Sequence, residues 1–458
     1  MKRRRDLGLV GLVAATYFMV SGGPYGLEEI VAGGYRAAFF ALIVTPLVWS
    51  LPTALMVGEL ASALPEEGGY YVWVRRALGP FWGFQEAWLS LAASVFDMAI
   101  YPTLVMLYAG RLPGAPRWAS SQPVGVLVVV ASAVWNLRGA RSVGRGSIAL
   151  GVALLCPFAL FAVLALAHAP LSLSGSLSAA RAAQPRDLLL GLLGTAPSAP
   201  SPGLPEPKIA SSIGAILVTM WNYMGWDNAS TIAREVDRPS RTYPRAVLWT
   251  LAIVVISYLV PVAAAAVAGI DPSGWTTGAW VGAARQVGGR GLALAVVVGG
   301  MVCGAGMFNA LLLSYSRLPA VLAEDGWLPS FFAAPRGSAR APAISIAVCA
   351  VAYATALGLG FDRLVELDVV FYGASLLLEF VALVVLRVRE PHLARPFRVP
   401  GGPWGLALTS LPPVALLGLA VWTSRDDRVG PLTFPVFAAI VVAAGAILYA
   451  VRRRPTPA

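Results

Sequence analysis

The chain has 458 residues, of which 57% are hydrophobic and 12% are charged, and its mean hydropathy is +0.71. Soluble domains carry about 25% charged residues, so this composition excludes a soluble globular protein and indicates a polytopic membrane protein. The formal net charge of +11 does not indicate nucleic-acid binding. If the N-terminus lies inside, 23 of the 34 Lys and Arg residues fall in inside segments, as the positive-inside rule requires. We therefore expect both termini to be cytoplasmic and no nucleic-acid partner.

Twelve apolar segments follow one another, most of them about long enough to cross a hydrocarbon core of roughly 30 Å. The predicted spans are residues 7–35, 37–62, 79–109, 122–136, 147–168, 209–235, 243–268, 289–322, 342–359, 363–388, 403–423 and 432–451. The sequence predicts an all-α protein with twelve transmembrane helices.

The first and sixth segments are each broken by a polar stretch rich in glycine. The breaks are Ser21-Gly22-Gly23-Pro24-Tyr25-Gly26 and residues 222–228 (NYMGWDN). An unpaired backbone group in hydrocarbon costs several kcal/mol, so non-helical chain at that depth persists only where it lines an enclosed cavity. We expect helices one and six to be unwound here and to lie against each other near the bilayer midplane.

The breaks also impose a register on the helices. Each lies about fifteen residues into the first helix of a five-helix unit, and five spans reverse the orientation of the second unit, which predicts an inverted repeat suited to alternating access. The predicted divisions are residues 1–168 (first repeat), 169–208 (external connection), 209–390 (second repeat) and 391–458 (two extra helices and a cytoplasmic tail). Residues 269–288 form a second external segment that we expect to cap the cavity.

A broken helix offers a ligand carbonyl groups at the end of its first half and N–H groups at the start of its second half. This geometry favours an ammonium group and a carboxylate, respectively. The predicted substrate-binding residues are Ser21, Gly22, Gly23, Pro24, Tyr25, Gly26, Glu29, Trp221, Asn222, Tyr223, Gly225 and Asp227. Two simpler alternatives stay open: Gly and Pro kink many transmembrane helices, and aromatic residues beside a break also serve as packing.

Acidic residues near the breaks bear on the charge of the substrate. Glu28 and Glu29 follow the first break, where carboxylates suit the N-terminal end of a helix, and Asp227 lies within the second. The two glutamates are either ordinary helix-start residues or a source of negative charge for an ammonium group. With Asp227, the second alternative favours a cationic amino acid or a polyamine.

Proton-coupling candidates are acidic groups within the apolar spans. A charge at the bilayer centre costs about 2.5–3.5 kcal/mol, so such a residue needs a partner or a function. Asp97, Glu379 and Glu28 are the candidates, although an inter-helix hydrogen bond is an equally simple role for Glu379. In the first inside loop we expect Glu59, Glu66 and Glu67 to form ion pairs near Arg75 and Arg76.

Several motifs carry a family resemblance. They are Ser21 to Glu29, residues 64–74 (LPEEGGYYVWV), residues 77–85 (ALGPFWGFQ), Trp221 to Asp227 with residues 234–239 (REVDRP), and Glu379-Phe380 ahead of residues 395–400 (RPFRVP). On these motifs the chain resembles the amino acid–polyamine–organocation superfamily, and within it the branch of plant polyamine and L-type amino acid transporters with their bacterial relatives. The resemblance implies a LeuT-like five-plus-five inverted repeat followed by two further helices.

We therefore expect a secondary transporter of the cell (inner) membrane that carries an amino acid or a polyamine, coupled to protons. A sodium-coupled or exchange-type amino acid transporter is the alternative, and an ion channel is a more distant one. We expect no enzyme activity, cofactor or metal site, because the sequence offers neither a nucleophile–base pair nor a Cys/His cluster. The oligomeric state is left open.

Overall fold

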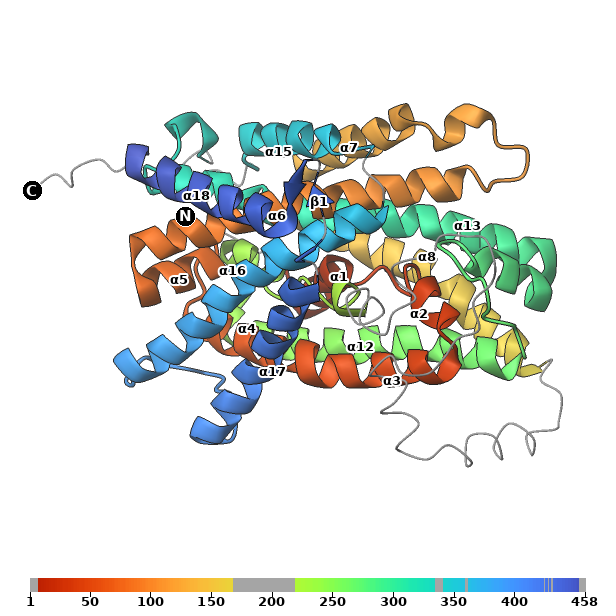
Figure 1. Cartoon of the computed structure of the whole chain (residues 1–458), viewed down its shortest axis with the longest axis horizontal. Coiled ribbons are helices and arrows are strands. Elements are labelled where there is room, and N and C mark those ends of the chain that lie inside the picture. Colours follow the sequence, from red (N-terminus) through yellow and green to blue (C-terminus); the bar gives the residue numbers. More distant parts are fainter. Residues whose placement is uncertain are drawn as a thin grey trace, which may run out of the picture.

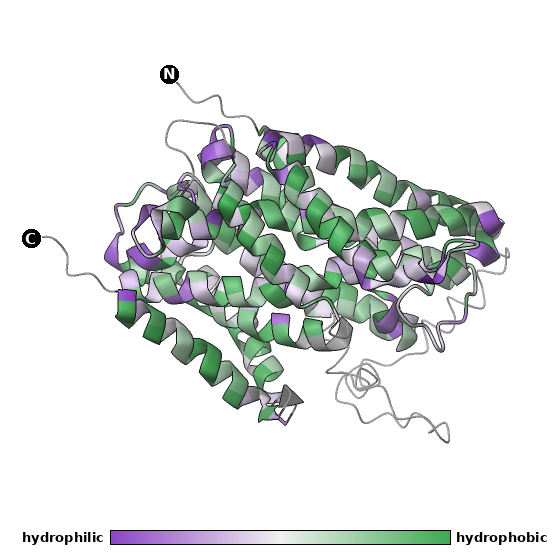
Figure 2. Cartoon of the chain, turned by 90° about the horizontal axis from the view of Figure 1, so that it is seen from above, coloured by the Kyte–Doolittle hydropathy of each residue, from purple (hydrophilic) through white to green (hydrophobic). Residues whose placement is uncertain are grey.

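The computed structural model describes residues 7–167, 219–333, 341–358, 361–423, 425–426, 428–429 and 431–452. These residues form an elongated bundle in which most of the long helices run along the long axis (Figure 1). Apolar residues cover the length of the helices, whereas hydrophilic residues gather toward the ends of the bundle (Figure 2). This is the distribution expected of a chain whose sides face lipid and whose ends face water.

The part of the chain before the external connection contains ten described helical elements. Their bounds are α1 Leu9–Val20, α2 Glu28–Ala32, α3 Tyr35–Thr45, the π-helical turn η1 Pro46–Ser50, α4 Leu51–Ala63, α5 Tyr70–Leu78, α6 Pro80–Ala109, the 3₁₀ turn η2 Arg117–Ser120, α7 Gln122–Asn136 and α8 Ala140–Ala167. The π-helical turn coincides with Pro46, which has no N–H to donate, so α3, η1 and α4 form one continuous span.

The second part begins with a short helical segment at residues 219–221 and continues through the second break. Its named elements are the 3₁₀ helix η4 Asn228–Glu235, α12 Pro239–Val267, α13 Trp280–Tyr315, α14 Arg317–Glu324, the 3₁₀ turn η5 Ser330–Phe332, α15 Ala343–Thr355, α16 Phe361–Arg389, α17 Gly402–Thr423, the two-residue strands β1 Arg428–Val429 and β2 Leu432–Thr433, and α18 Phe434–Arg452. The antiparallel β1–β2 pair was not anticipated from the sequence.

Most predicted spans coincide with helices to within a few residues. Eight described helical stretches are long and apolar enough to cross a membrane, and α1, α7 and α15 are shorter apolar helices. Residues 169–208 and the first part of the sixth predicted span lie outside the described residues. The arrangement of the helices as two inverted five-helix repeats therefore stays a prediction.

Two helix starts and one loop differ from the prediction. The fifth helix, α8, begins at Ala140 rather than at residue 147, and α13 begins at Trp280 rather than at residue 289. Residues 280–288 are therefore helical and only residues 269–279 form a loop, with a kink at Gly288 and Gly289 where α13 changes direction. The loop after α4 also contains an unpredicted helix, α5, whose apolar side is buried.

Over the described residues 7–32 and 219–235, the two broken segments run in opposite directions. The Leu7 amide at the start of the first segment donates to the Glu235 carbonyl at the end of the second (3.0 Å), and the Asp237 amide donates to the Leu7 carbonyl (2.9 Å). The beginning of one broken segment therefore meets the end of the other.

The end of the bundle that holds Leu7 also holds most ion pairs, and we call it the basic face (residues 64–79, 234–241, 316–327 and 387–400). At its most buried point the Glu59 carboxylate accepts from Arg387 at 2.5 and 2.7 Å, lies 3.2 Å from the Arg395 Nε, and accepts from the Val399 amide at 2.7 Å. The Glu59 side chain is wholly buried. These contacts fix the segment at residues 395–400 against α4.

The ion pairs predicted for the first loop have different partners. Glu59 pairs with Arg387 and Arg395, whereas Arg234 lies 3.3 Å from Glu67. Arg75 pairs with Asp325, and Arg76 binds Glu390 through two hydrogen bonds of 2.9 and 2.7 Å, which hold the pKa of the Glu390 carboxyl below its ordinary value. The predicted ion pairs of Glu59 and Glu67 are therefore confirmed, although their partners are not Arg75 and Arg76. Sequence proximity suggested those two arginines, but they face loops from the second half of the chain.

Replacing Glu59 with Gln should lower the thermal unfolding midpoint of the purified, detergent-solubilised protein. The substitution leaves two buried arginines without a carboxylate, and breaking a buried pair costs about 3–5 kcal/mol. The matched control is Glu390→Gln at the more exposed Arg76 pair, where a loss of about 0–1 kcal/mol is expected. Tryptophan fluorescence during heating measures both, and equal small shifts in the two variants would contradict the structural role of Glu59.

Candidate functional site

The first break joins α1 to α2 through seven non-helical residues. The Ser21 hydroxyl accepts from the Gly23 amide (3.0 Å), and Gly23 and Gly26 have φ values of +66° and +91°. Only glycine adopts such a conformation without steric cost, so these two positions explain why the break is glycine-rich. The Pro24 carbonyl, which no helix satisfies, accepts from the Trp280 indole at 2.8 Å.

The second break lies directly against the first. The Asn222 side-chain amide donates to the Gly26 carbonyl (3.2 Å), and the Tyr258 hydroxyl donates to the Asn222 carbonyl (2.6 Å). Gly225 has φ +88°, and a Cβ built there would lie only 2.2 Å from the Met19 carbonyl oxygen at the end of α1. The predicted unwinding at both breaks and their contact with each other are confirmed for the described residues.

Glu28 and Glu29 face the loop before α13. One Glu28 oxygen accepts from the Gly26 amide (2.7 Å), and the other accepts from the Tyr108 hydroxyl and the Gly278 amide (3.0 Å each). Its side chain is fully buried. The Thr277 hydroxyl lies 3.3 Å from a Glu29 oxygen. Three donors to one carboxylate join the break to this loop, so the structure gives Glu28 a positioning role.

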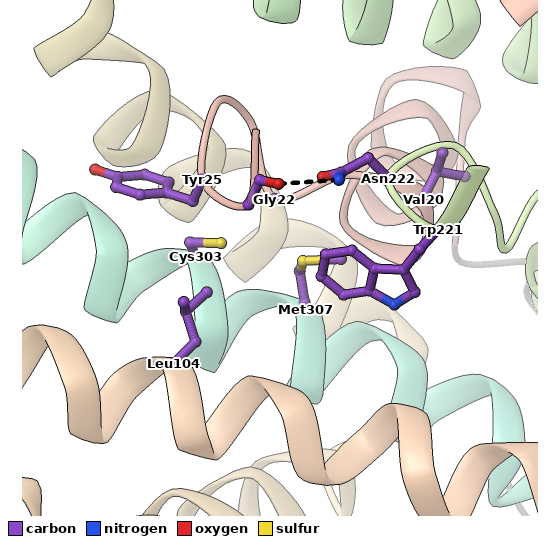
Figure 3. Close-up of a pocket in the computed structure, with 9 residues that line it drawn as sticks. Val20, Gly22, Tyr25, Leu104, Trp221, Asn222, Cys303 and Met307 are labelled. Carbon is purple, nitrogen blue, oxygen red and sulfur yellow. Dashed lines mark hydrogen bonds between the residues drawn. The ribbon is translucent and has the colours of Figure 1, made fainter. Parts of the chain in front are cut away.

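An apolar cavity lies beside the first break. Its lining is shown in Figure 3 and consists of Val20, Gly22, Tyr25, Gly26, Leu104, Trp221, Asn222, Cys303 and Met307. Gly22 faces Cys303 so closely that a Cβ at Gly22 would lie 2.5 Å from the sulfur. The Tyr25 hydroxyl is occupied by the Val296 carbonyl (2.6 Å), so this cavity offers a ligand mainly apolar surface.

A second cavity shares Val20 and Trp221 with the first and is acidic. Its lining is Met19, Val20, Asp97, Tyr101, Trp221, Met224, Gly225, Asn228, Tyr315, Asp368 and Tyr372. Asp97, from α6, accepts from the Tyr101 hydroxyl (2.5 Å) and the Tyr315 hydroxyl (3.3 Å). Asp368, from α16, has one oxygen with no hydrogen-bond partner among the described residues and is 2% exposed.

Three more buried carboxyl groups, those of Asp227, Glu379 and Glu86, lie near one another. The Tyr372 hydroxyl donates to Asp227 and accepts from the Gly225 amide (3.0 Å). Glu379 on α16 and Glu86 on α6 are wholly buried, and both interact electrostatically with Asp227. Glu86 accepts from the Ser90 hydroxyl (3.2 Å).

These five carboxyl groups have no basic counterpart: within the described parts of the chain, no salt bridge joins Asp97, Asp368, Asp227, Glu379 or Glu86 to an arginine or lysine. By helix geometry the last carbonyl groups of α1 also point out of its end, where a helix carries about half a negative charge. Because Met19 and Val20 line the acidic cavity, this negative potential adds to that of the carboxylates. The site is suited to a cation.

The predicted binding residues divide into two groups. Gly22, Tyr25, Gly26, Trp221, Asn222 and Gly225 line one of the two cavities, whereas Ser21, Gly23, Pro24, Glu29, Tyr223 and Asp227 line neither. Glu29 contacts the loop before α13, and the other five support the breaks through hydrogen bonds or backbone conformation. The Tyr223 hydroxyl, for example, donates to the Leu42 carbonyl at 3.0 Å. Of the proton-coupling candidates, only Asp97 lines a cavity.

Asp368 and Glu86 were not among the site residues predicted from the sequence. Both lie in predicted apolar spans, so their position was a usable signal for an intramembrane acidic residue. They lie only five and seven residues from the predicted span ends, or about 8–10 Å at 1.5 Å per residue, and so resembled interfacial residues. Tyr315 and Tyr372, which bind two of the acids, gave no sequence signal of their own.

A family model for amino acid permeases matches residues 12–448. The chain belongs to the amino acid permease family. It is therefore a multi-pass membrane transporter and not an enzyme. The resemblance inferred from the motifs is confirmed.

The chain is similar in sequence to several named transporters. It is 33% identical to a probable polyamine transporter of Arabidopsis thaliana over 95% of this chain and 85% of the relative. It is 34% identical to the polyamine transporter PUT1 of Oryza sativa subsp. japonica over 91% of this chain and 74% of the relative. The serine/threonine exchanger SteT of Bacillus subtilis is 23% identical over 87% of this chain and 86% of the relative.

A double-mutant cycle tests the contact between the first break and α13. Gly22→Ala places a methyl group on the Cys303 sulfur and should lower the thermal unfolding midpoint, because overpacking costs about 1–3 kcal/mol. Cys303→Ala removes the sulfur, so the double variant should recover part of that loss, while the Met307 sulfur at 2.9 Å still crowds the methyl group. Gly282→Ala in α13, where a Cβ meets nothing within 4 Å, is the control. Strictly additive effects of the two substitutions would contradict the contact.

Proposed function

We propose that this permease carries polyamines across the cell membrane by alternating access, coupled to protons. The observation that carries the proposal is the pair of carboxyl groups, Asp97 and Asp368, that face one cavity at the helix breaks without a basic partner among the described residues. A buried carboxylate without a counter-charge costs several kcal/mol. A substrate with ammonium groups supplies that counter-charge, whereas a neutral amino acid brings its own carboxylate into a negative site.

The rest of the lining suits the same chemistry. Trp221, Tyr101, Tyr315 and Tyr372 offer ring faces on which an ammonium group gains about 0.5–2 kcal/mol. The adjoining apolar cavity, with Leu104 and Met307, accommodates methylene groups. Alternating charged and methylene segments are what define a polyamine, so the two neighbouring cavities match its two kinds of surface.

Alternating access rests on the antiparallel course of the two broken segments. The hydrogen bonds of Leu7 with Glu235 and Asp237 support a five-plus-five inverted repeat of LeuT-like topology, since one broken segment starts where the other ends. We place the basic face and both termini in the cytoplasm, in accord with the positive-inside rule. Rocking of one repeat against the other then exposes the cavities to either side in turn.

Purified permease in liposomes should take up radiolabelled spermidine and putrescine saturably and take up leucine and serine at least tenfold more slowly. Asp97→Asn and Asp368→Asn should each raise the spermidine concentration for half-maximal uptake about ten- to a hundredfold, because a hydrogen bond to a charged group is worth about 1.5–3 kcal/mol.

The control for that experiment is Asp426→Asn, a conversion at an exposed acid far along the chain. It should leave uptake unchanged. Uptake of neutral amino acids alone by the unmodified permease would overturn the polyamine assignment and favour the exchange-type function named for SteT. Equal loss for all substrates in the two Asn variants would make Asp97 and Asp368 structural residues.

Proton coupling makes a separate prediction for the unmodified permease. Acidifying the side from which substrate enters should raise spermidine accumulation several-fold above the level without a gradient, because each transported cation then moves with protons flowing downhill. Replacing Na⁺ by K⁺ at constant ionic strength should have no effect. Strict dependence on Na⁺ would contradict proton coupling while leaving the transporter class intact.

A further inference from the structure

Glu86, Asp227 and Glu379 form a carboxyl cluster beside the acidic cavity and outside its lining. The three come from α6, the second break and α16, and each is at most 2% exposed. Tyr70 from α5 faces all three groups, and Ser90 and Tyr372 bind Glu86 and Asp227, respectively. These are the titratable and polar groups that the surrounding elements direct at the cluster, and none of them is basic.

An independent observation shows that the cluster lacks part of its hydrogen bonding. The Tyr70 hydroxyl and one oxygen of Glu86 have no hydrogen-bond partner among the described residues, and neither oxygen of Glu379 meets a donor there. Glu379 instead lies against the Asp227 carboxyl, and a hydrogen bond between the two requires a proton on one of them. Buried polar atoms are rarely left unpaired, because each costs about 1–3 kcal/mol. Tyr70 carries a hydroxyl and not a carboxyl group. Its unpaired hydroxyl therefore shows that the site lacks hydrogen bonds beyond those of the carboxyl groups themselves.

The chemistry of the missing ligand follows from the charges. Three carboxylates cannot stay ionised together in a dry site without cations. Among the described residues, no three Asp, Glu, His or Cys side chains converge closely enough to hold a metal ion, so the carboxyl groups do not share one cation. None of the three lines either cavity, which keeps a substrate ammonium group away. A proton is small enough to bind to each carboxyl group separately.

We propose that Glu86 and Glu379 are the proton-binding groups of this permease, coupled to the substrate cavity through Asp227 and Tyr372. This inference rests on the proposed proton-coupled function. One proton binds a carboxylate oxygen of Glu86 or Glu379 on the acidic side, forming an O–H bond, and the same bond breaks when the site opens to the other side. No other reactant is required.

Tyr372 explains how the two sites communicate. Its hydroxyl joins the Gly225 amide of the break to the Asp227 carboxyl, while its ring lines the substrate cavity. A substrate that moves Tyr372 therefore changes the hydrogen bonding of Asp227, which faces both glutamates. Asp97 and Asp368 bind substrate in this scheme, and Glu86 and Glu379 carry protons.

The test separates two activities of reconstituted permease: accumulation of spermidine driven by a pH gradient, and exchange of spermidine for spermidine at equal pH. Glu86→Gln and Glu379→Gln should each reduce gradient-driven accumulation at least tenfold while leaving exchange within about twofold of the unmodified protein. Glu66→Gln, at an exposed glutamate of the neighbouring loop, should change neither. Accumulation that survives undiminished in both Gln variants would overturn the proposal.

A variant that merely misfolds is recognised by a second substitution. If a Gln variant loses exchange as well, Glu379→Asp, which keeps a titratable carboxyl group, must restore gradient-driven accumulation to above the level of Glu379→Gln. Identical behaviour of the Asp and Gln variants would assign Glu379 a structural role and overturn the proposal.

The unmodified protein distinguishes this inference from the function on which it rests. If it transports spermidine without any response to the pH gradient, the proposed proton coupling fails. If it responds and both Gln variants respond equally, only the assignment to Glu86 and Glu379 fails.

Discussion

The need to pair every backbone polar group in hydrocarbon governs this site. Unwinding two helices in mid-bundle frees N–H and C=O groups that no water can reach, so side chains must replace the lost helical bonds. Indole groups perform this for two carbonyls: Trp280 donates to Pro24, and Trp49 and Trp226 both donate to Tyr223 at 3.1 and 2.8 Å. The breaks exist because surrounding helices supply these donors.

That constraint also explains why Glu28 and Asn222 are not simply ligand-binding groups. Glu28 accepts from two backbone amides, and Asn222 donates to the Gly26 carbonyl, so each repairs a group that the first break exposes. The acids that face the cavity without such a repairing role are Asp97 and Asp368, which lie on the neighbouring helices α6 and α16. The glycines bring the breaks together, and the helices behind them bring the charge.

Much of the fold could be predicted because hydropathy and glycine content are local properties of the sequence. The two breaks, the apolar spans and the membrane acids Asp97 and Glu379 all follow from them. Partnership is not local: the Glu59 carboxylate meets Arg387 and Arg395, more than 300 residues away, and the sequence gives no register for that contact. For the same reason Asp368 and Glu86 could be recognised as acidic and apolar-flanked, but their relation to Tyr372 and Asp227 required the packing of α6 against α16.

The basic face combines two kinds of ion pair, and the difference bears on motion. Glu59 with its arginines is buried, and breaking it costs about 3–5 kcal/mol, so this ion pair holds α4 and residues 395–400 together. Arg75–Asp325, Arg76–Glu390 and Arg234–Glu324 are each partly exposed and worth about 0–1 kcal/mol apiece. Breaking all three costs a few kcal/mol at most, which is about the free-energy difference between two populated conformations of a protein. Because Arg75–Asp325 and Arg76–Glu390 join the first half of the chain to the second, we expect the basic face to open along these two pairs while its buried anchor stays intact.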